Sequence, residues 1–457
     1  MKKRQLFRII PLMRTFFVLS GLLFVMADGC LAQVCGCTDS LATNYNPDAT
    51  VNDGSCQYAP SIISASEIGL LNSALDGTST LFYWNNGYWT YNDHFDWRLY
   101  RIDSTNATIQ ETLYLKEIRN EDAEEIAQDS LYLYFGDIGN NICGCRDNLK
   151  ILRVSKKSLL NQIFKVDTIA FSYEDQTYTS VSENSTDFDC EAFIVSDDSI
   201  YLFTKEWISN QTTLYSLPKT PGTHVAHRRG TYNVQGLVTG ATYLPEYRLV
   251  VLCGYDYNSS DIVSALHPFI VLLYDFQGNN FFSGNKRRLD FETAAKAQVE
   301  AIATTNALDY YITNEHLNTT YMGVITINIP AKLQRLDLRE YLVPYLSQYI
   351  DSFPPPPDSL SYPDTIPPSD GIFNPHNDAD GFHLYPNPTK DILHIDYPPE
   401  FQGAEYSILN LNGQKVAEGI LREDVILLDD KKLTSGKYIL VIRGKKKTRT
   451  FSFIKSE

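Results

Sequence analysis

The sequence predicts an all-β protein: a five-bladed β-propeller followed by a small Ig-like β-sandwich, with a sixth, degenerate blade as the alternative. Short runs of alternating apolar residues recur between Asn, Gly and Pro turns along most of the chain. Self-comparison shows a loose repeat of roughly 50–65 residues, as stacked or radial units produce. Helical periodicity is nearly absent. Together these observations favour repeated antiparallel sheets around an axis.

Residues 1–32 are predicted to be a signal peptide. Basic residues among the first fourteen precede the apolar run Phe16–Met26, which is too short for a confident membrane span. We expect cleavage near Ala32, leaving Gln33 as the new N-terminus. A lipoprotein site at Cys30 is the alternative, although Asp28 just before it fits poorly. No other segment is apolar enough to cross a bilayer, so we expect a secreted or surface-attached protein that travels through the periplasm.

Composition limits the possible partners. The 457 residues exceed one ordinary domain, and 39 basic against 55 acidic residues give a formal charge of −16. This balance argues against nucleic acid or an anionic membrane as a partner. The 30 Tyr and 23 Phe residues suit an extracellular β-protein whose aromatic side chains pack its sheets.

The cysteines leave an odd number after the signal peptide, so at least one thiol is expected to be free or to pair elsewhere. Cys253, within the apolar run LVVLCGY, is predicted to be a buried, inert thiol. Cys143 and Cys145 flank a single glycine. We expect a disulfide between them to be strained, which favours a partner such as Cys190 or Cys35.

Residues 33–59 form a small separate module, with the sequence CGCTDSLATNYNPDATVNDGSC at its centre. It resembles a short module found in many secreted Bacteroidetes proteins. A segment of this size is too small for a hydrophobic core and needs a covalent link. Cys37 and Cys56 are the natural disulfide pair, worth about 3 kcal/mol in the chain-entropy model. Two roles stay open for its acidic and amide side chains, binding Ca²⁺ or capping turns: Asp39, Asn44, Asn46, Asp48, Asn52 and Asp53.

Residues 60–349 are predicted to form the propeller. Each unit starts with a strand such as DCEAFIVSD (Asp189–Asp197) and returns in one such as IYLFTKE (Ile200–Glu206). Asn86-Gly87 predicts a type I′ hairpin turn between the first pair. The strand Ile62–Leu71 precedes the first unit and is expected to close the ring by pairing with the last.

Acidic residues recur where the first strand of each unit starts and the second ends. In an antiparallel hairpin these two places are neighbours, so all units should aim them at one face of the channel. Because burying clustered carboxylates uncompensated raises their pKa values, we expect a cation, and all-oxygen ligands favour Ca²⁺. The predicted metal ligands are Glu124, Glu125, Asp137, Asp189, Glu191, Glu300 and Glu315. The predicted ligand-binding residues are Asp93, Asn140, Asn141, Lys205, Glu206 and Tyr255.

Two alternatives stay open for this face. In the alternative interpretation, the acids cap strand ends and bond to backbone amides of the next blade. Likewise, the segment GDIGNN (Gly136–Asn141) is either a metal or anion loop or a turn between blades.

The pattern of paired acids resembles a group of secreted Bacteroidetes propellers and is more distantly similar to phytase-like and SdiA-regulated propellers. The phytase-like resemblance implies Ca²⁺ ligands at Glu124, Glu125, Asp137, Glu191 and Glu300, and a phosphate-facing cation at Lys205. The face has no Arg cluster, however, and a phosphate site normally needs several cations. No nucleophilic triad can be identified, so catalytic residues stay unknown. We therefore expect a Ca²⁺-dependent binding protein for glycan, peptide or another envelope protein, with a Ca²⁺-dependent phosphoester or other ester hydrolase as the alternative.

Residues 350–381 are a Pro-rich linker, which should be extended and without a core. Residues 382–457 carry YPNPT, then NLNGQKV, then LTSGKYIL. In order and spacing these motifs resemble the type A C-terminal sorting domain of the Bacteroidetes type IX secretion system. The resemblance implies recognition by that machinery and release at the cell surface or outside it.

Overall fold

The computed structural model describes most of the chain from Gln33 onward. The predicted signal peptide and nearly all of the predicted linker lie outside the described residues. The described ranges are 33–93, 96–118, 121–161, 165–179, 182–256, 266–292, 295–321, 325–350, 382–385, 389–390, 392–398, 401–410, 415–421, 425–428, 433–444 and 448–455.

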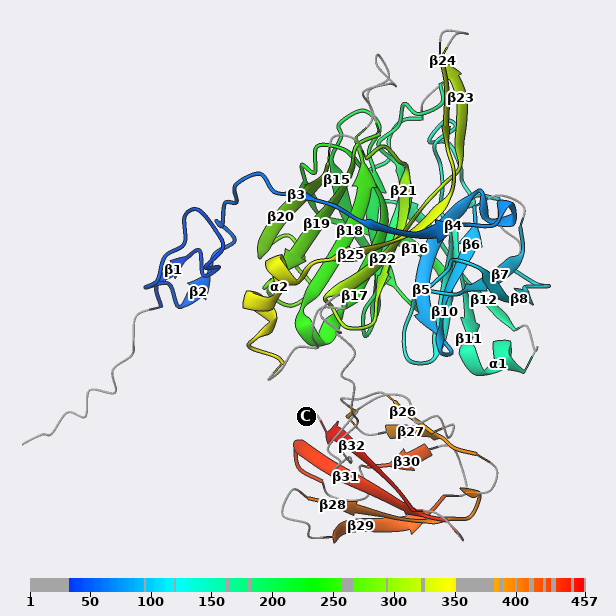
Figure 1. The fold of residues 1–457 in the computed structure, drawn as a ribbon, viewed down its shortest axis with the longest axis vertical. Coiled ribbons are helices and arrows are strands. Elements are labelled where there is room, and N and C mark those ends of the chain that lie inside the picture. Colours follow the sequence, from blue (N-terminus) through cyan, green and yellow to red (C-terminus); the bar gives the residue numbers. More distant parts are fainter. Residues whose placement is uncertain are drawn as a thin grey trace, which may run out of the picture.

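Antiparallel sheets of four strands account for most of the region predicted to be a propeller (Figure 1). The first contains β5 (Thr78–Trp84), β6 (Gly87–Asn92), β7 (Arg98–Ile102) and β8 (Ile109–Tyr114). The second contains β9 (Ala123–Gln128), β10 (Tyr132–Asp137), β11 (Lys150–Ser155) and β12 (Val166–Tyr173). The third contains β13 (Asp189–Val195), β14 (Ser199–Lys205), β15 (Thr212–Pro218) and β16 (Gly222–Tyr232). Parallel pairing of β12 with β16 joins the second and third into one eight-stranded sheet.

Two further sheets include strands from the start of the chain. The first contains β17 (Leu237–Leu244), β18 (Leu249–Tyr255), β19 (Pro268–Tyr274), β20 (Asn285–Phe291) and the short β3 (Ile62–Ile63). The second contains β21 (Val299–Thr304), β22 (Asp309–Asn314), β25 (Lys332–Asp337) and β4 (Ser66–Leu70). The hairpin of β23 (Leu317–Tyr321) and β24 (Ile325–Ile329) projects from this sheet (Figure 1).

The first strands of these sheets form a closed cycle. In the described part of the chain β5 contacts β9, β9 contacts β13, β13 contacts β17, β17 contacts β21, and β21 contacts β5. The sheets therefore radiate from a common axis, and the all-β, propeller-like architecture is confirmed.

The N-terminal strand closes this arrangement as predicted. β4 pairs antiparallel with β25, so residues near position 70 join a sheet made by residues 299–337. The predicted strand is divided, however, because β3 pairs instead with β20 in the neighbouring sheet.

The cores lie between neighbouring sheets. Strands β18 and β19 are buried along their whole length, which explains their continuous apolar sequences. Cys253 lies in this core as a free, fully buried thiol, as predicted. The first hairpin turn differs by one residue from the prediction. Asn85 and Asn86, both with positive φ, occupy its centre, and Trp84 pairs with Gly87.

Helical elements are short, and the sequence patterns missed them. They are α1 (Lys156–Leu160), α2 (Arg339–Leu346) and the 3₁₀ turns η1 (Ser73–Leu75) and η2 (Pro245–Tyr247). Helix α2 buries Leu342 and Leu346 against the core of the last sheets. Among the described residues, no helix is both long and apolar enough to cross a bilayer.

The C-terminal region folds as two sheets over one shared core. One contains β26 (His383–Tyr385), β27 (Ile392–Asp396) and β30 (Val425–Leu427). The other contains β28 (Glu405–Leu409), β29 (Lys415–Ile420), β31 (Gly436–Arg443) and β32 (Thr448–Lys455). Ile395, Ile408 and Leu440 contribute buried side chains from both sheets to this core.

The small N-terminal module has only two short paired strands, β1 (Cys35–Gly36) and β2 (Val51–Asn52). The predicted disulfide between Cys37 and Cys56 is confirmed. The prediction for the other cysteines was wrong, because Cys143 pairs with Cys145 across the single glycine, while Cys35 and Cys190 are free. The glycine between them has a positive φ, which allows the tight turn.

The module's Asp and Asn side chains cap turns in this structure. Asp39, Asn46, Asn52 and Asp53 each accept a hydrogen bond from the backbone N–H two residues later, at 2.9–3.0 Å. This observation favours the capping alternative over Ca²⁺ binding.

Candidate functional site

Each inner strand carries a one-residue irregularity near its start. In β9 the pairing with β10 passes from Glu125 to Ala123 and skips Glu124. The same register shift occurs in the other inner strands. A bulge of this kind leaves one residue unpaired and re-aims its side chain. The skipped residues are Ser79, Glu124, Glu191, Thr239 and Glu300.

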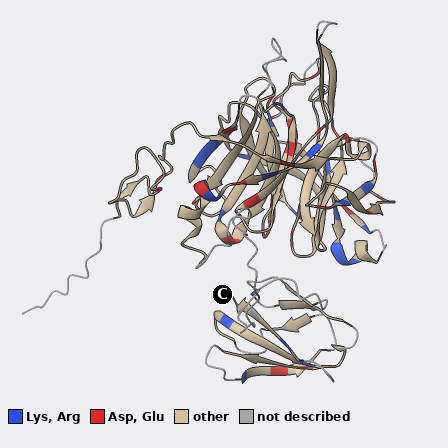
Figure 2. Cartoon of the chain, in the orientation of Figure 1, with Lys and Arg blue, Asp and Glu red and all other residues tan. Residues whose placement is uncertain are grey.

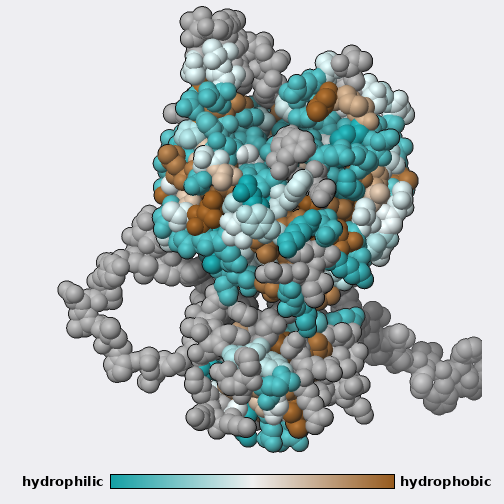
Figure 3. Space-filling model, turned by 90° about the vertical axis from the view of Figure 1, so that its right-hand side faces the viewer, coloured by the Kyte–Doolittle hydropathy of each residue, from teal (hydrophilic) through white to brown (hydrophobic). Residues whose placement is uncertain are grey.

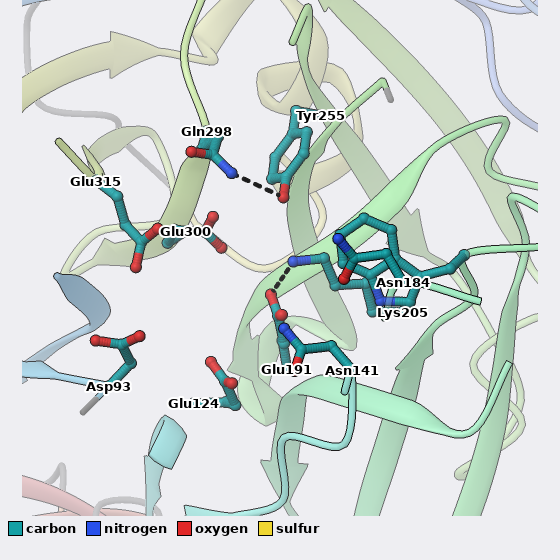
Figure 4. Close-up of a pocket in the computed structure, with 11 residues that line it drawn as sticks. Asp93, Glu124, Asn141, Asn184, Glu191, Lys205, Tyr255, Gln298, Glu300 and Glu315 are labelled. Carbon is teal, nitrogen blue, oxygen red and sulfur yellow. Dashed lines mark hydrogen bonds and ion pairs between the residues drawn. The ribbon is translucent and has the colours of Figure 1, made fainter. Parts of the chain in front are cut away.

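These bulges divide into two chemical kinds. Ser79 donates a hydrogen bond to the carbonyl of Ala123, and Thr239 donates to the carbonyl of Val299, so each hydroxyl ties its strand to a neighbouring sheet. The other bulges present glutamates, whose longer side chains extend into a common pocket (Figure 4). The bulge therefore decides which glutamate of the pair Glu124–Glu125 reaches the pocket.

The pocket has a volume of about 160 Å³ and receives residues from every sheet of the ring. Carboxylates line one side, and an ammonium group, aromatic rings and amides line the other (Figure 4). Elsewhere in the described chain, acidic and basic segments are scattered (Figure 2), so this concentration of carboxylates is local. The lining residues are Asp93, Glu124, Asn141, Asn184, Glu191, Lys205, Trp207, Tyr255, Gln298, Glu300 and Glu315.

Glu124 and Glu300 are buried without a hydrogen-bond or ion-pair partner among the described residues. Their exposed fractions are 8% and 5%, and both side chains line the pocket. Burial, followed by the charges of Glu191 and Asp122, raises the pKa of Glu124 well above its ordinary value. Burial also raises the pKa of Glu300 well above its ordinary value, although Lys205 opposes the shift. Each carboxyl therefore holds a proton at a pH where an exposed glutamate is ionised, or needs a positive partner.

Lys205 and Glu191 form a buried ion pair in the opposite half of the pocket. Their Nζ and Oε2 atoms are 2.6 Å apart, and both side chains are almost fully buried. The Lys205 ammonium also lies 4.8 Å from the ring centre of Trp207 and 5.2 Å from that of Tyr255. Burial alone would lower the pKa of Lys205, but Glu191 and other nearby negative groups raise it well above its ordinary value. Burial raises the pKa of Glu191 to about 7 despite its cationic partner.

Glu125 lies outside the pocket lining and bridges three inner strands. It accepts hydrogen bonds from the Thr80 hydroxyl, from its neighbour's N–H at Ile126 and from the N–H of Ala241 at 3.1 Å. Corresponding positions on two other inner strands are Gly240 and Ala301, which leave room for this long side chain. Burial raises the pKa of Glu125 to about 8.

Four other predicted site residues also lie outside the pocket lining. Asp137 forms ion pairs at 2.7 Å with Arg146 and with Lys150. Asp189 accepts hydrogen bonds from the Asn140 N–H and from the Trp207 indole, and so positions that ring. Of these contacts, only the hydrogen bond from the Asn140 N–H to Asp189 agrees with the alternative in which acids bond to backbone amides of a neighbouring blade.

Asn140 and Glu206 likewise hold local structure. The Asn140 amide donates to the carbonyl of Phe188 and accepts from the N–H of Arg146. Glu206 accepts from the hydroxyls of Thr204 and Ser209. The segment Gly136–Asn141 is not the predicted turn between blades, because it lies between β10 and β11 of one sheet. Its residue Asn140 is bonded to the neighbouring sheet, and Asn141 lines the pocket.

The structure brings together the other eight predicted residues: Asp93, Glu124, Asn141, Glu191, Lys205, Tyr255, Glu300 and Glu315. Sequence reasoning missed Asn184, Trp207 and Gln298. Trp207 and Gln298 lie one or two residues beyond the strand ends that were considered, so a wider window would have included them. Asn184 lies in a loop with no comparable signal.

The carboxylates are not arranged as a metal site in this structure. Among the described residues, no group of three or more His, Cys, Asp or Glu side chains is placed to hold a metal ion. Lys205 already supplies a positive charge to Glu191.

The C-terminal region matches a known family. Residues 383–456 match the family described as "Secretion system C-terminal sorting domain". This match supports the chain as cargo of the type IX secretion system, with export to the cell surface or secretion. The type IX resemblance of the tail is therefore confirmed.

The solved structures similar to this chain include distant likenesses. Glutaminyl cyclase from Myxococcus xanthus is 12% identical, with 61% of this chain and 99% of that chain covered and a TM-score of 0.35. The PQQ-bound aldose sugar dehydrogenase from Streptomyces coelicolor is 9% identical, with 61% and 99% covered and a TM-score of 0.33. PorZ, a surface component of the type-IX secretion system of Porphyromonas gingivalis, is 11% identical, with 82% and 70% covered and a TM-score of 0.20.

These likenesses transfer no activity to this chain. The comparison with curated proteins found no match. None of the matches described above is to a phytase-like or SdiA-regulated propeller, so that resemblance stays a prediction.

Proposed function

We propose that this protein is an exported binding protein, secreted or held at the cell surface, whose propeller takes up a cation in the acid-lined pocket. In this proposal the propeller has five blades, and the Ig-like C-terminal sandwich is the part that the type IX machinery recognises. The observation that carries the proposal is the pair of buried carboxylates, Glu124 and Glu300, which face the pocket without a partner among the described residues.

An unpartnered buried carboxylate is costly to keep ionised, and a cation bound beside it in the pocket reduces that cost. The pocket also holds Glu315 and Asp93 on the same side, against a single ammonium that is already paired (Figure 4). Attraction of a positive ligand follows from this imbalance.

Calcium is one candidate cation, because carboxylate and amide oxygens are its preferred ligands. Glu124 and Glu300 would hold it, together with Glu315 or Asp93. Among the described residues, no three or more His, Cys, Asp or Glu side chains are placed to hold a metal ion, so Ca²⁺ binding would require side-chain movement.

The alternative of ester hydrolysis has less support. Phosphate recognition needs several cationic groups. Among the described residues that line the pocket, only Lys205 is basic, and Glu191 neutralises it.

The proposal is tested by titrating the exported chain with Ca²⁺, Mg²⁺ and n-butylammonium while following thermal unfolding and heat of binding. All four Trp residues lie between positions 84 and 207, so Trp fluorescence reports the propeller and not the sorting domain. We expect at least one of these cations to raise the unfolding temperature of the native protein. The double variant E124Q/E300Q should lose this effect and should be more stable than the native protein without ligand, because it removes buried charge.

The matched control is E111Q/E117Q, which removes two exposed glutamates that do not line the pocket. It should respond to cations as the native protein does. The proposal fails if no cation shifts the unfolding temperature, or if E124Q/E300Q and the control respond alike.

A further inference from the structure

Three loops beside the pocket carry apolar side chains that are left in solvent. Ile142 is 69% exposed, Tyr178 is 45% exposed and Ile208 is 57% exposed. Ile142 directly follows the pocket residue Asn141, and Ile208 directly follows Trp207. We call these three exposed residues the apolar shelf. On the face in Figure 3 hydrophilic residues predominate among the coloured residues.

Hydrogen bonds connect the loops that carry the shelf. The N–H of Asn184 donates to the carbonyl of Asn141 at 2.9 Å. The N–H of Trp207 donates to the carbonyl of Thr186 at 3.1 Å, and the next N–H donates to the Asp187 carboxylate at 2.9 Å.

Two further contacts hold the shelf. The Cys143–Cys145 disulfide closes the loop next to Ile142. The ring of Tyr178 packs edge-on against buried Phe188, with 5.4 Å between ring centres. The loops that carry the shelf are therefore held in place by hydrogen bonds, a disulfide and a ring contact.

The pocket has a larger volume and a more varied lining than a bare metal ion requires. Its volume of about 160 Å³ corresponds to about five water molecules of liquid, which is the scale of a lysine or arginine side chain. The rings of Trp207 and Tyr255 give one wall an aromatic surface that an alkyl stem or a cation can contact. Glu124 and Glu300 provide acceptors for the charged end of such a side chain.

We infer that the ligand is a polypeptide that inserts a lysine or arginine side chain into the pocket and rests its apolar neighbours on the shelf. The inference depends on the proposed function, that the pocket takes a cation, and it names the partner that presents this cation. Charge complementarity with the carboxylates favours a basic side chain in the pocket. The apolar shelf favours a polypeptide that has hydrophobic residues next to this basic residue. A bare metal ion or a free amine would leave the shelf uncovered.

The test measures fluorescence anisotropy of labelled peptides with the full exported chain. The probe is Gly-Ile-Lys-Ile-Gly with blocked ends. One comparison peptide has norleucine in place of the lysine, and another has alanine in place of both isoleucines. We expect the norleucine peptide to bind about 100-fold more weakly, because the buried carboxylates lose their cation. The alanine peptide should bind about 10-fold more weakly.

Protein variants separate the two parts of the proposed interface. E124Q/E300Q should reduce binding of the lysine peptide to the level of the norleucine peptide. The shelf variant I142S/I208S should weaken the lysine peptide about 10-fold and leave binding of n-butylammonium unchanged. The control L131S/L160S removes two exposed leucines that do not line the pocket, and it should change neither.

The outcomes distinguish this inference from the proposed function. If Ca²⁺ or n-butylammonium binds with dependence on Glu124 and Glu300 but no peptide binds, the polypeptide inference is overturned and the proposed function stands. If no cation of any kind binds, both are overturned. If I142S/I208S binds the lysine peptide as tightly as the native chain does, the role of the shelf is refuted.

Discussion

The buried carboxyl of Glu125 should make the stability of the propeller fall as the pH rises, and the change Glu125→Gln should remove its share of this dependence. The side chain accepts hydrogen bonds from Thr80, Ile126 and Ala241, so it joins β5, β9 and β17 inside the ring. Glutamine has nearly the same shape and keeps an acceptor for the N–H of Ala241. The variant should therefore fold.

The magnitude follows from the two pKa values. Burial raises the pKa of Glu125 to about 8 in the folded protein, whereas an unfolded chain has a glutamate pKa of about 4.3. Between these values the folded state binds one more proton than the unfolded state, so the free energy of unfolding decreases with pH. The slope for one proton is at most about 1.4 kcal/mol per pH unit. Over the whole interval the loss amounts to about 5 kcal/mol.

The assay is urea denaturation followed by Trp fluorescence at several pH values between about 4 and 9. We expect the stability of E125Q relative to the native chain to rise with pH at up to about 1.4 kcal/mol per unit and to level off above about pH 8. The control variant E117Q removes the same charge from an exposed position, and its relative stability should stay level. A difference between E125Q and the native chain that is constant, or that shrinks, as the pH rises would refute the reasoning.

Three further predictions concern the pocket and the N-terminal module. Changing Lys205→Met should destabilise the propeller by about 3–5 kcal/mol, because Glu191 is left buried without its partner; the double variant E191Q/K205M should recover most of this loss in the same urea assay. The affinity of the pocket for n-butylammonium should keep rising with pH well above the ordinary glutamate pKa of about 4.3, because burial raises the pKa values of Glu124 and Glu300 and the cation binds their ionised forms; calorimetry that shows a flat or falling profile would contradict it. Replacing both Cys37 and Cys56 with serine should cost the module about 3 kcal/mol and expose it to limited proteolysis, while an unchanged Trp-detected transition is expected for the propeller.

The sequence could predict which end of the hairpins gathers the acids, because that follows from antiparallel pairing alone. It could not predict which of two adjacent glutamates faces the pocket. In β9 a bulge at Glu124 turns that side chain toward the pocket, whereas the side chain of Glu125 extends across the ring. No residue type at this position predicts the bulge.

The partners of Asp137 were also missed. Asp137 ends its strand as Lys205 ends the corresponding strand of the next sheet, yet Arg146 and Lys150 form ion pairs with it. Arg146 lies in the loop after β10, nine residues along the chain, whereas Lys150 is the cross-strand partner of Asp137 in β11 and could have been found from the register of that hairpin. The pairing of Cys143 with Cys145 was missed because the strain expected of so short a loop was given more weight than proximity.

The tail was recognised from sequence more securely than the propeller, and the reason is physical. Its motifs are contiguous runs such as LTSGKYIL, whose last five residues form the start of β31, so one short segment carries the signal. In the propeller each sheet contributes only one to three residues to the pocket, and the repeated strands differ in nearly every apolar residue.

The pairing of β4 with β25 determines which step of folding must come last in the propeller. Lys332 and Glu67 form an ion pair although 265 positions separate them in the sequence. Strand β4, near the N-terminus, therefore cannot pair until β25 is present. Contacts this remote slow folding. A chain that still lacks the sheet of residues 299–337 also lacks Glu300 and Glu315, so its pocket is unfinished until the circle of sheets can close.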